Sequence, residues 1–115
     1  MQIVLPKETA VGEKRTALVP DAVKKLVRMG AKVSIEASAG QASGFTDAEY
    51  EAAGASVSHD RAALLGSGDL VLRVRKPELA EVGLLKSGSV HVSFLDPFNE
   101  RELIDALQAN NISAI

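Results

Sequence analysis

Cationic side chains follow two β-rich stretches of the sequence, at positions where an anionic group could be bound. Lys7 comes two residues after the first stretch, Lys14 and Arg15 follow in the same loop, and Arg75 follows the fourth stretch. A guanidinium holds a carboxylate or phosphate through two parallel hydrogen bonds, whereas an ammonium group acts as a point charge. Arg15 and Arg75 are therefore the stronger candidates for an anion cleft, and Lys7 and Lys14 are secondary ones.

The same cations have a second interpretation, as solvated loop charges that pair with neighbouring carboxylates. Glu8, Glu13 and Glu78 all lie close to them in the sequence. The chain has 13 Lys and Arg against 15 Asp and Glu, a net charge of −2. Any positive field must therefore be local, and spacing alone leaves both interpretations open.

Several other sites are not supported by the sequence. The first β-rich stretch is followed by Pro6, Lys7 and Glu8 and not by G-x-G-x-x-G, so this domain is not expected to hold NAD by itself. The glycine-containing segment 40–44 lacks the Lys-Ser/Thr pair of a phosphate loop and is predicted to be a turn. His59 and His91 have no companion at metal-ligand spacing, so we expect surface or loop roles for both and no metal site.

The elements that must position these residues alternate between short β-rich and amphipathic helical stretches. Predicted strands cover 2–5, 32–37, 55–58, 69–74, 89–95 and 112–115. Predicted helices run from Pro20 to a stop at Gly30, over 46–54, over 60–65 with a stop at Gly66, over 78–85, and from Asn99 onward. Two expected capping boxes with hydrophobic staples are Thr46 with Glu49, flanked by Phe45 and Tyr50, and Asn99 with Glu102, flanked by Phe98 and Leu103.

Strands separated by helices cannot pair as hairpins, so a parallel sheet covered by helices is the economical architecture. We expect one α/β domain over residues 1–115, a three-layer αβα sandwich that is flavodoxin-like or Rossmann-like without a glycine fingerprint. Ligands of such sheets bind outside the carboxyl ends of the strands. With a 2-1-3-4-5 strand order, the loops after the first and fourth strands would lie near one edge, which would bring Arg15 and Arg75 together.

Composition narrows the class of protein. Hydrophobic residues make up 46% of the 115 residues and charged residues 24%, as in ordinary globular domains. The acidic balance argues against a nucleic-acid partner, and no apolar run is long enough for direct membrane insertion. The absence of cysteine excludes a disulfide scaffold, and we expect an untargeted, cytoplasmic chain.

Several segments resemble the N-terminal domain shared by alanine dehydrogenases and the alpha subunit of proton-translocating NAD(P) transhydrogenases. They begin with Lys7-Glu8-Thr9 and Gly12-Glu13-Lys14-Arg15-Thr16-Ala17-Leu18-Val19-Pro20, and continue in the family's order through Gly44-Phe45-Thr46-Asp47, 69–77 and Ser93-Phe94-Leu95. The resemblance covers essentially the whole chain. It implies the first of two Rossmann-like subdomains of a larger NAD-binding unit.

The resemblance also separates the two branches of this family. Alanine dehydrogenases are known for an Arg that holds the pyruvate carboxylate, matched here by Arg15, for a Lys where this chain has Arg75, and for a catalytic His where it has Asp96. An arginine cannot titrate as a lysine can, and a carboxyl group donates no proton near neutrality unless its pKa is strongly raised. The run from Ser93 to Asn99 is similar to the transhydrogenase branch, in which hydride passes directly between nicotinamides and no catalytic acid or base is needed.

The resemblance therefore implies no catalytic residue in this chain, no cofactor bound by it alone, and NAD bound by the complete protein. The implied partners are the missing second subdomain, a transhydrogenase beta subunit and further copies in a homo-oligomer, with attachment to the inner membrane only through those subunits. An alanine dehydrogenase-like fragment is the alternative within the family. A freestanding, non-catalytic module for assembly or anion binding is the alternative from another class.

We predict that the isolated chain binds NADH weakly or not at all, because Pro6, Lys7 and Glu8 replace the glycine-rich turn on which a pyrophosphate rests. Titration calorimetry measures this directly. One-to-one binding with a micromolar or tighter dissociation constant would contradict the prediction.

Overall fold

One parallel sheet organises the computed structural model, which describes residues 1–95 and 99–115. Its strands are β1 (Gln2–Leu5), β2 (Lys32–Glu36), β3 (Ser56–Ser58), β4 (Leu70–Arg75), β5 (Val90–Phe94) and β6 (Ser113–Ala114). They lie in the order β3-β2-β1-β4-β5-β6, and every pairing is parallel. The α/β prediction is confirmed in its Rossmann-like form. The order 2-1-3-4-5 is wrong, because β1 pairs directly with β4.

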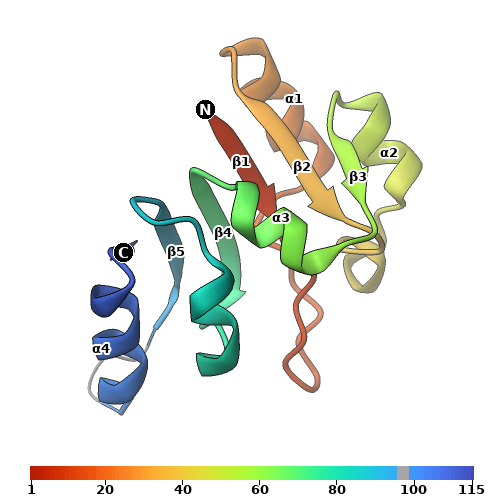
Figure 1. Cartoon of the computed structure of the whole chain (residues 1–115). Helices are drawn as coiled ribbons and strands as arrows, with labels where there is room; N and C mark the ends of the chain where they lie inside the picture. The colour runs from red at the N-terminus through yellow and green to blue at the C-terminus, as the bar shows by residue number, and fades with distance from the viewer. Residues whose placement is uncertain (96–98) are drawn as a thin grey trace.

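Helices cover both faces of this sheet (Figure 1). They are α1 (Pro20–Arg28), α2 (Asp47–Ala52), α3 (Arg61–Ser67) and α4 (Arg101–Ala109), together with the 3₁₀ helices η1 (Gln41–Ser43) and η2 (Leu79–Leu84). α1 and α2 pack on one face, and α3, η2 and α4 pack on the other. None of the helices in the described part of the chain is long and apolar enough to cross a membrane.

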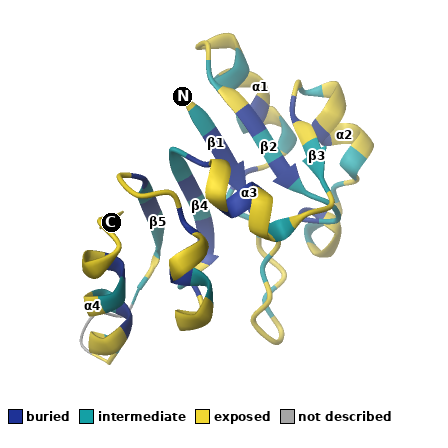
Figure 2. Cartoon of the chain, in the orientation of Figure 1, coloured by how far each residue is buried: buried dark blue, intermediate teal, exposed yellow. Residues whose placement is uncertain are grey.

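The alternation of side chains along β1 divides the core between the two faces. Ile3 and Leu5 join the cluster under α1 and α2, while Val4 joins the cluster under α3 and α4. Figure 2 shows the buried residues concentrated along the strands and on the inner sides of the helices. The sheet is therefore apolar on both faces, as expected for parallel strands between helical layers.

The predicted start of α2 is confirmed in detail. Thr46 and Glu49 form the capping box, with the Thr46 hydroxyl accepting the Glu49 N–H at 3.2 Å and the Glu49 carboxylate accepting the Thr46 N–H at 3.2 Å. The rings of Phe45 and Tyr50 meet edge to face with centroids 6.4 Å apart. The Tyr50 hydroxyl also donates to the Leu18 carbonyl at 2.7 Å, which fixes the loop before α1 to α2.

Two of the predicted helices in the second half of the chain are corrected by the structure. α3 continues through Gly66 to Ser67, because Gly66 lacks the left-handed φ of a terminating glycine and the Ser67 hydroxyl donates to the Leu64 carbonyl at 2.8 Å. The short segment after Pro77 forms the 3₁₀ helix η2 and not an α-helix.

The last helix, α4, begins one residue later than predicted. Its N-cap position is held by Glu100 and not by Asn99, and the Glu100 carboxylate binds Lys76 in the loop after β4. Phe98, the expected staple residue, lies outside the described residues.

We predict that Gly40→Ala lowers the free energy of unfolding by about 1–3 kcal/mol, the usual cost of overpacking a core. A Cβ at Gly40 would lie 2.5 Å from Cε2 of Tyr50, whose ring is fully buried and tied to Leu18. Gly83→Ala is the matched control, because its Cβ would meet nothing within 4 Å. Urea denaturation checks both variants, and equal midpoints would contradict this account of the packing.

Candidate functional site

The strand order of this sheet reverses between β1 and β4, so the switch point lies at the carboxyl ends of these two strands. β1 pairs with β2 on one side and with β4 on the other, so the chain leaves the two central strands towards opposite faces. Ligands of open α/β sheets bind at such a switch point. The long loop that follows β1 projects beyond this edge in Figure 1.

Glu8 fixes that loop to the end of β4. Its two carboxylate oxygens accept the backbone N–H groups of Val74 and Arg75, each at 2.9 Å. The hydroxyl of Thr9 donates to the Glu78 carboxylate at 3.2 Å a little further along. The pairing of β4 with β5 is irregular between Leu72 and Arg75. The Glu8 carboxylate therefore lies where backbone N–H groups depart from the regular strand pairing.

Glu13 binds both predicted arginines. Its Oε2 accepts the N–H of Arg15 at 3.0 Å and the Nε–H of Arg15 at 2.9 Å, while its Oε1 accepts from Nη2 of Arg15 and Nε of Arg75, each at 2.7 Å. The hydrogen bonds from Arg15, followed by the one from Arg75, hold the pKa of the Glu13 carboxyl far below its usual range. The carboxylate is therefore ionised at any physiological pH.

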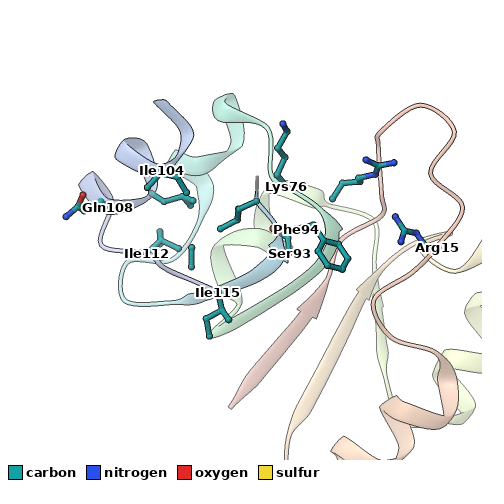
Figure 3. Close-up of a pocket in the computed structure, with 12 residues that line it drawn as sticks. Arg15, Lys76, Ser93, Phe94, Ile104, Gln108, Ile112 and Ile115 are labelled. Carbon is teal, nitrogen blue, oxygen red and sulfur yellow. The ribbon is translucent and has the colours of Figure 1, made fainter. Parts of the chain in front are cut away.

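A cavity of about 1010 Å³ opens beside this cluster. Arg15, Arg75 and Lys76 lie on its cationic side, and Figure 3 shows Arg15 on the side opposite the end of α4. The Lys76 ammonium is paired with the Glu100 carboxylate. The remaining wall is mainly apolar and comes from β5, α4 and β6; it consists of Ser93, Phe94, Leu95, Ile104, Leu107, Gln108, Ile112, Ala114 and Ile115.

The structure thus brings together two of the four predicted cations. Lys7 and Lys14 are not among the residues that line the cavity. The Lys7 backbone is held on the other side of β1, where its N–H donates to Glu36 at 2.8 Å and its carbonyl accepts from Arg61 at 2.9 Å. The Lys14 carbonyl accepts the Ser43 hydroxyl, which ties it to η1. Both interpretations of Arg15 and Arg75 hold at once, since they line a cavity and also pair with Glu13.

A partly buried chain of ion pairs supports this edge of the sheet and was not predicted. Arg61 donates to Glu36 at 2.6 Å and to both oxygens of Glu81 at 2.6 and 3.0 Å, and Arg73 reaches Glu81 at 3.4 Å. Hydrogen bonds from Arg61 lower the pKa of Glu81, while burial lowers that of Arg73. The network joins β2, α3, η2 and β4. No sequence signal points to it, because its bonded pairs are between 8 and 25 residues apart.

His91 does not have the expected surface or loop role. It is the second residue of β5, with its side chain fully buried, and pairs with Val71 of β4. Its Nε2 has no hydrogen-bond partner among the described residues, and its Nδ1 is 3.4 Å from the Ser93 hydroxyl. His59 is exposed, as expected, and no cluster of metal-ligating side chains occurs within 1–95 and 99–115.

The sequence matches the family described as alanine dehydrogenase/PNT, N-terminal domain, over residues 4–115. The chain belongs to this family. It is 38% identical to an NAD(P) transhydrogenase subunit alpha polypeptide of Rhodospirillum rubrum and 36% identical to alanine dehydrogenase of Mycobacterium tuberculosis. These matches cover 99% and 100% of the chain, but 31% of each relative, so the chain spans about a third of their length.

Solved structures of a transhydrogenase and of an alanine dehydrogenase contain a region with the same fold as this chain. A transhydrogenase from Sinorhizobium meliloti superposes with a TM-score of 0.93 at 35% identity, covering 99% of this chain and 34% of that one. An L-alanine dehydrogenase superposes with a TM-score of 0.95 at 35% identity, covering 100% and 32%. The predicted family is therefore confirmed, whereas Asp96, at the expected position of the alanine dehydrogenase histidine, lies outside the described residues.

We predict that the titration of His91, taken by itself, lowers the free energy of unfolding by about 2 kcal/mol between pH 7 and pH 5. Burial, followed by the charge of Arg73, lowers the pKa of His91 from 6.5 to about 4. The unfolded chain therefore takes up a proton in this range that the folded chain does not, so stability is lost as the pH falls below 6.5.

Denaturation curves at the two pH values check this prediction about His91. His91→Leu should remove the loss, and His59→Gln, which changes the exposed histidine, should leave it unchanged. An equal pH dependence in the His91 variant and the unmodified chain would contradict the assignment.

Proposed function

We propose that the chain is the N-terminal region of the NAD(H)-binding component of a proton-translocating NAD(P) transhydrogenase, which transfers hydride between NADH and NADP. The observation that carries this proposal is the chemistry of the cavity. Among the described residues that line it, the ionisable ones are two arginines and a lysine, and the rest are uncharged. Hydride transfer between nicotinamides requires orientation of two cofactors and no acid or base, which agrees with such a wall.

The same proposal makes this region inactive alone. The backbone N–H groups of Val74 and Arg75 at the switch point already bind the Glu8 carboxylate. No glycine-rich turn follows β1, where the chain continues with Pro6, Lys7 and Glu8. In our proposal NAD is held by the complete protein, with its pyrophosphate on the two thirds of the length that the relatives have in addition.

Within the complete protein, Arg15 and Arg75 form a cleft for an anionic group. Both guanidiniums line the cavity and both are more than half exposed. The partners under this proposal are the second subdomain, a beta subunit and further copies of the chain, in the cytoplasm and at the inner membrane through those subunits.

Alanine dehydrogenation is the second candidate, favoured by Arg15 alone. This arginine lies on the cavity, where the alanine dehydrogenases of the family are known to hold a carboxylate. The reaction also needs a group that accepts protons from the amine and from the attacking water. Arg75, which stands in place of the lysine, is bound to Glu13 and stays cationic, so we favour the transhydrogenase assignment.

The complete protein, given a partner that supplies NADP(H), should exchange hydride between NADH and an NAD analogue, and alanine-dependent NADH formation should stay at background. Absorbance assays of the two reactions measure both rates. The double variant Arg75→Lys with Asp96→His introduces the residues that alanine dehydrogenases have at these two positions, and it is expected to gain alanine turnover. Robust alanine-dependent turnover by the unmodified protein would contradict the branch assignment.

A further inference from the structure

The carboxylate of Glu13 lies beneath the two arginines that line the cavity. Its side chain is 4% exposed, whereas those of Arg15 and Arg75 are 61% and 55% exposed. In an ordinary surface ion pair both partners are solvated and mobile. Here the acid is fixed inside the loop, and the two bases extend from it towards solvent.

The bonding leaves one edge of each guanidinium open. Arg15 uses Nε and Nη2 for Glu13, and Arg75 uses Nε. Within the described residues, Nη1 of Arg15 and both Nη atoms of Arg75 have no hydrogen-bond partner. These outer edges are the donors available to a ligand in the cavity, and Glu13 determines how they are held.

We propose that Glu13 lowers the positive potential of this site and so weakens its preference for anions with two negative charges over those with one. The two guanidiniums carry two positive charges, the Glu13 carboxylate bound to both of them offsets one, and the nearby Glu8 carboxylate adds a further negative charge that acts on Arg15. Lys76 adds no net charge because it is paired with Glu100.

The Glu13 carboxylate, held in place by its bonds to both arginines, repels each negative charge of a bound ligand, so it weakens the binding of a dianion more than that of a monoanion. The inference rests on the proposed anion cleft of Arg15 and Arg75 and deepens it.

Coulomb repulsion sets the size of the expected effect. At about 6 Å in a water-like dielectric, the Glu13 charge weakens the binding of each ligand charge roughly 3-fold. It therefore acts once on a monoanion and twice on a dianion. Neutralising Glu13 should strengthen binding roughly 3-fold for a monoanion and roughly 10-fold for a dianion, at low ionic strength where screening is weak.

The test uses two three-carbon probes of similar shape, propanoate and malonate, at neutral pH and low salt. Binding to the 115-residue chain is followed by NMR through the Nε–H resonances of Arg15 and Arg75, which detect weak association. Glu13→Gln removes the charge and keeps an oxygen acceptor. Glu13→Asp keeps the charge with a shorter side chain, and Glu51→Gln removes the same charge from the exposed surface of α2.

We expect Glu13→Gln to raise the ratio of malonate to propanoate affinity roughly 3-fold, and Glu13→Asp and Glu51→Gln to leave that ratio unchanged. A ratio unchanged in Glu13→Gln, or changed equally in Glu13→Asp, would overturn the role of the charge and leave the cleft in place. If neither probe shifts the arginine resonances in any variant, the anion cleft itself is overturned. None of these results depends on hydride transfer, so the transhydrogenase assignment is tested separately.

Discussion

The carboxylate of Glu8 joins the loop after β1 to the end of β4, and the arrangement of the carboxyl edge depends on this contact. Because β1 and β4 are neighbours, a single glutamate side chain is long enough to span from one strand end to the other. With the loop held there, Glu13 comes within 2.7 Å of Arg75, which is 62 residues away in sequence. Arg15 follows two residues later and completes the cluster.

This contact also distinguishes the carboxyl edge of the sheet from that of a nucleotide-binding Rossmann domain. In that domain, glycines after the first strand let a pyrophosphate approach backbone N–H groups at the switch point. Here a protein carboxylate takes a place at that edge and binds the N–H groups that end β4. In our proposal the chain therefore supplies one wall of a cleft, and the phosphate-binding surface lies in the remaining two thirds of its relatives' length.

The sequence predicts the parallel sheet and most of the elements, because periodicity and caps are local. The strand order is not local, since helical connections of similar length allow both the flavodoxin-like and the Rossmann-like arrangement. The burial of His91 is equally hard to predict. A polar residue among the alternating apolar residues of a strand does not show whether helices cover its face of the sheet. Pairing of the loop cations with Glu13 is one of the two interpretations that the sequence allows, but the binding of Arg15 and Arg75 to the same carboxylate required the fold.

A crystal structure of the complete protein with NADH bound tests the central claim most directly, because it locates the pyrophosphate relative to Glu8. We predict that the pyrophosphate lies on a glycine-rich turn outside residues 1–115, with the Glu8 carboxylate still bound to the N–H groups of Val74 and Arg75. Pyrophosphate oxygens on those two N–H groups, with Glu8 displaced, would contradict the account.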